Sequence, residues 1–157
     1  MNATEHSMVV DARPPALVVR LTNMIMRPLL RTPLGRLMKP LALLEFTGRH
    51  SGARRRVVVG WHPDAAAAVV LTPAPWRANF DRALPTTVYW CGRRHAFVGT
   101  LDADPARIAA TVNALLQNGT SARSLALRIP DGQPIVETDI TRTRRNIIRF
   151  ERVEPPS

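Results

Sequence analysis

The sequence predicts a mainly β fold with flanking helices, of the α+β class, in which one small antiparallel barrel carries helices on its outside. Three observations support this prediction. Six or so short segments rich in β-branched and apolar residues follow one another along the chain. Short turns join two pairs of these segments, as in antiparallel hairpins. One helical segment comes late, after most of the strands, where it is expected to cover the outside of the barrel.

Strands are expected wherever a short apolar run lies between turn residues. Pro40 opens the first of these runs. His62-Pro63-Asp64 has turn chemistry, so His62 is expected to be exposed, and Gly92-Arg93-Arg94 provides a second, tighter turn. The expected strands cover residues 41–46, 57–61, 67–72, 86–91, 95–101 and 146–153.

Start and stop signals predict two helices among and after these strands. Pro75 stands at or near the first position of a short helix that is expected to reach residue 84. Asp104 is a candidate N-cap for the second helix, and Pro105 occupies its first position. Asn118-Gly119 provides the stop signal, because these two residue types favour the conformation that ends a helix.

The amino-terminal segment has the pattern of an amphipathic helix broken by prolines. Pro28 and Pro33 divide it, and residues 34–38 add a further turn. No acidic residue stands between Arg13 and Pro40. Two readings remain open: a helix in the headgroup layer of an anionic membrane, or a helix that closes one mouth of the barrel. The apolar face of this helix is formed by Leu17, Leu21, Met24 and Ile25.

Length and composition fit one globular domain. The chain has 157 residues, a length that suits one domain and is short for two, and 45% of them are hydrophobic, which is enough for one buried core. We expect a mobile leader over 1–15, a helical segment over 16–39 and the barrel domain over 40–154. Neither a signal peptide nor an apolar run of about 18 residues is visible, so the cytoplasm is the expected compartment. The membrane reading would add peripheral contact at the inner face of the membrane.

The net charge of +10 comes from arginine, since Lys39 is the only lysine. Guanidinium groups suit phosphates and carboxylates, although GC-rich codons explain the same bias equally well. We expect no nucleic acid partner, because eight aromatic residues in all and no recognition motif are too little for one. Cys91 is the single cysteine and is expected to be a buried apolar residue, while His6 and His95 have no metal-ligand spacing. No metal site is predicted.

One loop combines glycines with cations. The string T-G-R-H-S-G-A-R-R occupies residues 47–55. Its two glycines allow the backbone to approach an anion, and Arg49, Ser51 and Arg55 supply donors around it. The alternative is a solvated basic loop. If the following strand has already begun, Arg54 and Arg56 face away from Arg55 and stay at the surface.

This string, together with W-R-A-N-F at residues 76–80, resembles the deazaflavin-dependent nitroreductase family from about Leu41 to about Leu116. The resemblance implies a split antiparallel β-barrel of the FMN-binding type and the cofactor F420, with FMN as an alternative. It departs from the family where His50 replaces a common lysine and Val58 a common proline. The implied cofactor-binding residues are Arg49, His50, Ser51, Gly52, Arg55, Val58, Thr72, Trp76 and Asn79.

The resemblance implies an oxidoreductase that transfers a hydride from reduced F420 to a small electron-poor acceptor such as a quinone or an enone. No catalytic residue is identified, because the cofactor carries the chemistry. Nitro reduction is not carried over, because Tyr89 is the only tyrosine and the family's substrate-facing tyrosines have no counterpart. The alternative is a non-catalytic barrel that binds a lipid or sequesters the cofactor, as a monomer or a homodimer.

Overall fold

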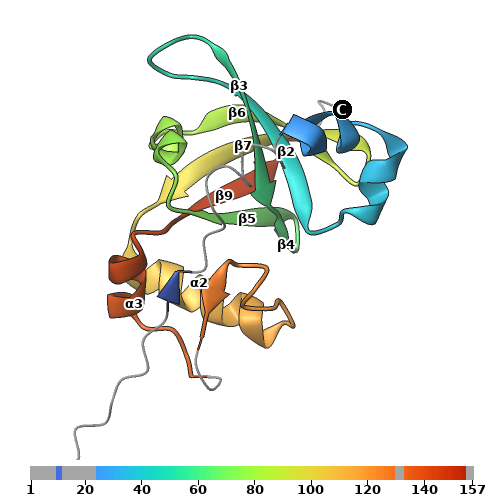
Figure 1. Cartoon of the computed structure of the whole chain (residues 1–157). Helices are drawn as coiled ribbons and strands as arrows, with labels where there is room; N and C mark the ends of the chain where they lie inside the picture. The colour runs from blue at the N-terminus through green and yellow to red at the C-terminus, as the bar shows by residue number, and fades with distance from the viewer. Residues whose placement is uncertain (1–9, 12–23, 130–132, 155–157) are drawn as a thin grey trace, which may run out of the picture.

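The computed structural model describes residues 10–11, 24–129 and 133–154. Seven strands of this part form one curled antiparallel sheet in the order β3-β2-β6-β7-β9-β5-β4 (Figure 1). This confirms the mainly β fold and its split-barrel form. The strands are β2 (Leu41–Thr47), β3 (Arg54–Gly60), β4 (His62–Asp64), β5 (Ala67–Thr72), β6 (Leu84–Trp90), β7 (Arg93–Asp102) and β9 (Asn146–Arg152).

A single bend brings the two edges of the sheet together. β3 lies at one edge and β4 at the other, yet only Trp61 separates them in the chain. The N–H of Trp61 donates to the carbonyl oxygen of Pro40 at 2.9 Å, and its side chain is 2% exposed. The bend therefore closes one end of the barrel, while the amino-terminal half of β3 remains an edge.

The interior of the barrel is apolar and rich in aromatic rings. Alternate residues of β2 point inward. Phe150 and Phe80, the last residue of the short helix η2 (Pro75–Phe80), are both fully buried. The rings of these two residues lie 5.6 Å apart in an edge-on arrangement. The buried interior residues are Ala42, Leu44, Phe46, Val59, Trp61, Ala68, Val70, Phe80, Val88, Phe97, Ile148 and Phe150.

A second apolar core lies between the outside of the barrel and two helices, α2 (Pro105–Gln117) and α3 (Glu137–Thr143) (Figure 1). Asp104 caps α2 as predicted, since its carboxylate accepts from two backbone N–H groups of the first turn. Two residues of the expected leader form β1 (Val10–Asp11), which pairs with β8 (Leu127–Arg128). The rest of the leader lies outside the described residues.

The predicted turn at residues 62–64 is wrong. These residues form β4, and the turn follows at residues 65–66, where Ala65 has a φ of 52°. Ala65 and Ala66 are not residue types that favour turns, so this turn has no signal in the sequence. His62 is accordingly only 7% exposed rather than exposed.

The region around Cys91 also differs from its prediction. Cys91 and Gly92 form the turn between β6 and β7, with φ values of 52° and 71°. Cys91 is therefore a half-buried turn residue rather than a buried strand residue. A two-residue turn with both φ values positive matches the right-handed twist of an antiparallel hairpin, which places β7 from Arg93 onward.

The amino-terminal segment is helical over 24–29 and continues as the 3-10 helix η1 (Pro33–Leu37). Leu30, between them, is fully buried. Leu17 and Leu21, half of the predicted apolar face, lie outside the described residues. No helix within the described ranges has the length and apolar character needed to cross a membrane.

Candidate functional site

The loop between β2 and β3 is folded back on itself. The N–H of Gly48 donates to the carbonyl oxygen of Ala53, and the N–H of Gly52 to that of Gly48, both at 2.8 Å. A Cβ at Gly48 would lie 2.8 Å from Ser51 Oγ and 3.0 Å from Arg55 Nε. Ser51 and Arg55 thus approach the backbone of Gly48 in a space that only glycine leaves open.

Asn79 joins this loop to η2. Its Oδ1 accepts from the backbone N–H of Arg49 at 2.9 Å, across 30 residues of chain, and its Nδ2 donates to the carbonyl oxygen of Trp76 at 2.7 Å. The guanidinium of Arg49 forms an ion pair with Asp81 just after η2. The two segments that carry the family resemblance therefore meet at one end of the barrel.

The position of η2 is fixed from both sides. Trp76 is half-buried, and its ring lies 6.0 Å from that of Phe46 and 6.1 Å from that of Phe80. On the other side, Arg77 Nε donates to Asn146 Oδ1 at 2.7 Å, at the start of β9. These contacts hold the indole of Trp76 beside the open edge of β3.

A cleft of about 570 Å³ runs along this edge. Because Arg55 pairs with Phe46 across the β2–β3 ladder, its side chain lies on the inward face of the sheet. Arg56 pairs with Glu45 and lies on the opposite face, as the sequence predicted. The cleft, here called the arginine cleft, is lined by Arg27, Arg54, Arg55, Arg56, Val57 and Trp76.

Positive charge in the arginine cleft is only partly compensated. Glu45 forms ion pairs with Arg56 at 2.7 Å and with Arg54 at 3.6 Å. Burial alone would raise the pKa of Glu45. The hydrogen bond from Arg56 and the charges of the neighbouring arginines together outweigh this effect, so the pKa lies below its usual value and the carboxylate stays ionised. Arg55 has no acidic partner among the described residues, so Glu45 pairs with only two of the four arginines that line the cleft.

Arg27 is a cleft residue that the sequence reading missed. Its Nη2 donates to the carbonyl oxygen of Arg56 at 2.7 Å, at the edge strand. The sequence predicts only an amphipathic helix in this segment, because periodicity carries no information about which distant strand a side chain reaches. Arg54 and Arg56, expected as surface charges, also line the cleft, since a cleft along an edge strand touches both faces.

The remaining predicted residues are dispersed. His50 and Gly52 are exposed in the loop, beside Ser51. Thr72 is 7% exposed, and its Oγ1 accepts from the N–H of Ala74 at 3.1 Å, which shapes the entry to η2. Val58 pairs with Leu43 on the face opposite to Val57. Of the nine predicted cofactor-binding residues, only Arg55 and Trp76 line the arginine cleft itself.

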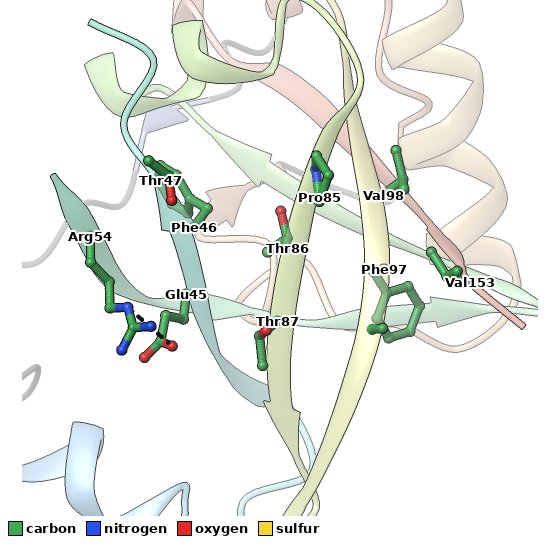
Figure 2. A pocket seen from close by; sticks show the side chains of 11 residues that line it. Glu45, Phe46, Thr47, Arg54, Pro85, Thr86, Thr87, Phe97, Val98 and Val153 are labelled. Carbon is green, nitrogen blue, oxygen red and sulfur yellow. Dashed lines mark ion pairs between the residues drawn. The ribbon is translucent and has the colours of Figure 1, made fainter. Parts of the chain in front are cut away.

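A second hollow of about 490 Å³ lies on the outer face of β2, β6 and β7 (Figure 2). Its walls include Pro85, Thr87 and Val98, and its only charged side chains are Arg54 and Glu45. These two form the ion pair dashed in Figure 2, so this groove carries no excess charge. Within the residues the structure describes, no group of three or more His, Cys, Asp or Glu side chains is arranged to hold a metal.

No model of a known protein family matches the chain, and no curated protein matches its sequence. The solved structures similar to it include HutZ, the heme storage protein from Vibrio cholerae, at 10% identity and a TM-score of 0.49 over 77% of this chain and 87% of that one. A putative pyridoxamine 5′-phosphate oxidase from Listeria innocua matches at 7% identity and a TM-score of 0.46, over 76% and 89% of the two chains. An F420 reductase matches at 14% and 0.42, over 82% and 93%. The split-barrel assignment rests on the strand order and register of the chain itself.

Proposed function

We propose that the arginine cleft binds the anionic deazaflavin F420 and that the protein is an F420H2-dependent oxidoreductase acting on an electron-poor acceptor such as a quinone or an enone. One observation carries this proposal. The two segments that resemble the deazaflavin-dependent nitroreductases are joined by the hydrogen bond between Asn79 and the N–H of Arg49, beside a cleft with four arginines.

The residues present fit such a cofactor. F420 carries a phosphate and a glutamate tail, and guanidinium groups bind both kinds of anion through paired N–H donors. The loop at Gly48 brings Ser51 and Arg55 around a bare backbone, a cradle that a Cβ would fill. Trp76 offers an aromatic wall for a flat ring system. The volume of about 570 Å³ lies within the usual range of ligand pockets.

The protein's part in the reaction is binding and orientation. The deazaflavin, when bound, supplies the hydride chemistry. Arg55 and Ser51 hold anionic groups at the loop, and Trp76 excludes water from one side of the cleft. The ionisable side chains that line the cleft are all arginines, which keep their protons at neutral pH. Water or a nearby hydroxyl would therefore supply the proton that completes reduction of the acceptor.

The position of the single tyrosine favours a second candidate function, in which the barrel binds the cofactor without catalysing a reaction. The only tyrosine, Tyr89, lies under the guanidinium of Arg31, whose carbon is 5.0 Å from the ring centroid. Tyr89 therefore packs against Arg31 and does not line the arginine cleft, so it does not replace the substrate-facing tyrosines of the family. FMN, which also carries a phosphate, remains the alternative ligand.

The test is a fluorescence titration of the protein with F420, in parallel with FMN. A hydrogen bond to a charged group contributes about 1.5–3 kcal/mol, so Arg55→Ala is expected to weaken F420 binding roughly tenfold to a hundredfold. Arg123→Ala, an exposed arginine outside the cleft, is the matched control and is expected to leave affinity unchanged. Equal affinity of the wild type and Arg49→Ala/Arg55→Ala would reject the site.

Turnover is measured separately. Reduced F420 is expected to be oxidised by a menadione-like quinone faster with the protein than without it. Tight binding of F420 without acceleration for quinones, enones or nitroaromatics would support the holding function instead.

A further inference from the structure

Exposed apolar side chains are concentrated at one place in the chain. Among the described residues, six large hydrophobic side chains are exposed, and four of these lie between positions 24 and 37. Leu37 is 84% exposed and Leu34 is 59% exposed. Residues three apart in a 3-10 helix lie on the same side, so these two leucines present one apolar edge of η1. The other two are Met24 at 68% and Ile25 at 54%.

The backbone around these side chains is tied to the barrel. Leu30 is fully buried, and Gly35 packs so closely that a Cβ would lie 2.9 Å from the carbonyl oxygen of Leu30 and 3.2 Å from the backbone nitrogen of Gly92. Gly92 in turn would place a Cβ 2.9 Å from the carbonyl oxygen of Thr32. η1 is therefore seated on the turn between β6 and β7, and this seating leaves Leu34 and Leu37 facing outward.

Cations from η1 and from the β6–β7 hairpin line a hollow between the two segments. A hollow of about 400 Å³ is lined by Arg36 and Lys39 from the η1 side and by Trp90, Cys91, Arg93 and His95 from the hairpin. Trp90 Nε1 donates to the carbonyl oxygen of Lys39 at 2.8 Å, which links the two sides. Positions 24–40 and 89–95 contain no Asp or Glu. We call residues 24–39 and 89–95 together the basic apolar surface.

We propose that the basic apolar surface docks on an anionic lipid bilayer. A membrane interface accepts apolar side chains below the headgroups and places phosphates at the level of the flanking cations. Both halves of the surface are then used: Leu34 and Leu37 insert, while Arg36, Lys39, Arg93 and Arg94 bind lipid phosphates. A nucleic acid would neutralise the cations and leave the leucines in water, so the charge and the apolar edge together favour lipid.

The test is cosedimentation of the full chain with vesicles of phosphatidylcholine alone and with phosphatidylglycerol added. Binding is expected only to the anionic vesicles. Leu34→Ser/Leu37→Ser is expected to reduce it roughly tenfold. Arg93→Gln/Arg94→Gln is expected to reduce it roughly twenty-five-fold, because each cation near an anionic surface contributes on the order of a fivefold gain. The matched controls are Val136→Ser and Arg123→Gln/Arg128→Gln, exposed residues outside this surface, which are expected to bind as the wild type does.

Each contrary result overturns the proposal. Equal binding to neutral and anionic vesicles, equal loss in the controls, or no binding to anionic vesicles at low salt would reject lipid docking. Dimerisation that Leu34→Ser/Leu37→Ser abolishes, without vesicle binding, would assign the surface to a second copy of the chain. Thermal unfolding of each variant establishes that it is folded. Neither leucine lines the arginine cleft, so this proposal and the cofactor proposal fail or succeed separately.

Discussion

At the scale of single residues, Asn79 makes the contact on which the candidate site depends. Its carboxamide accepts from the N–H of Arg49 and donates to the carbonyl oxygen of Trp76, so one side chain sets the distance between the loop and η2. The Arg49–Asp81 ion pair lies next to it. An exposed ion pair contributes little to stability, whereas a hydrogen bond to a half-buried backbone group is costly to lose.

Asn79→Ala is therefore expected to lower the free energy of unfolding by about 1–3 kcal/mol, because the N–H of Arg49 loses its acceptor. Asn79→Asp keeps an acceptor and loses only the donor, so it is expected to be the milder change. Urea unfolding of the two variants measures the difference. A midpoint for Asn79→Ala that equals that of the wild type would contradict this role for Asn79.

His62 links stability to pH. Burial lowers the pKa of His62 below its ordinary value of 6.5, so the folded protein holds the imidazole neutral while the unfolded chain takes up a proton. The contribution of neutral His62 to the free energy of unfolding is therefore fully present above pH 6.5 and is lost progressively as the pH falls below 6.5. His95 adds to the effect in the same direction, because burial and the charges of Arg152 and Arg93 lower its pKa.

The measurement is the melting temperature between acid and neutral pH for the wild type and His62→Gln. The variant is expected to be less stable at neutral pH but to lose less stability on acidification. A parallel pH dependence of the two proteins would show that His62 is not the titrating group.

At the scale of the elements, β7 passes closely beneath η2 and pairs with β9, with Gly99 opposite Phe150. A Cβ at Gly99 would lie 2.7 Å from Cε1 of Phe150 and 2.7 Å from ring carbons of Phe80. Both rings are fully buried, so neither has room to move aside. The absence of a side chain at Gly99 thus sets how closely the two rings pack over the strand.

Gly99→Ala is expected to destabilise the protein by about 1–3 kcal/mol through overpacking. Thr100→Ala, at the exposed neighbouring position of the same strand, is the control and is expected to change stability by less than about 0.5 kcal/mol. Thermal or urea unfolding measures both. An unchanged Gly99→Ala protein would mean that the two rings are not held in this packing.

The elements with strong local signals were predictable from the sequence, and those held by distant contacts were not. The apolar runs of β2, β5 and β9 and the capped start of α2 were all recognisable. The turn after β4 was not, because Ala65 takes a positive φ without turn chemistry. α3 was not predicted, because its seven residues include only one large apolar side chain, Ile140, that is buried in the second core.

The same distinction applies to the candidate site. The family resemblance implied that the loop and η2 contribute to one cofactor site, and in the structure the two segments are in contact. The contribution of Arg27 depends on a hydrogen bond to Arg56, 29 residues away, which no local pattern encodes. Cleft residues on an edge strand are hard to predict from sequence, because a cleft along the edge is lined by side chains from both faces of the strand.

At the scale of the whole molecule, cationic side chains line two separate regions. One is the arginine cleft at the split of the barrel, and the other is the basic apolar surface around η1. Arg27 lies in the helical stretch of that surface and reaches the cleft through the carbonyl of Arg56. The two regions are therefore connected through one short helix, although each is tested by a different experiment.

The salt dependence of F420 affinity distinguishes binding in a charged cleft from binding through apolar contacts. If F420 is held mainly through arginines, its affinity is expected to fall as ionic strength rises, because exposed charges are screened over about 10 Å at 0.1 M salt. The fluorescence titration, repeated in sodium chloride, measures this dependence. An affinity that is independent of salt would point to binding through apolar contacts elsewhere on the barrel.

The most direct test of the central claim is an amide and indole NMR spectrum of the labelled protein, recorded with and without F420. The account predicts that the shifted resonances are those of the loop at Gly48 and Gly52, the edge strand at Arg55 and Val57, and the indole N–H of Trp76. Shifts confined to the groove around Pro85, Thr87 and Val98, or no shifts at saturating F420, would contradict it.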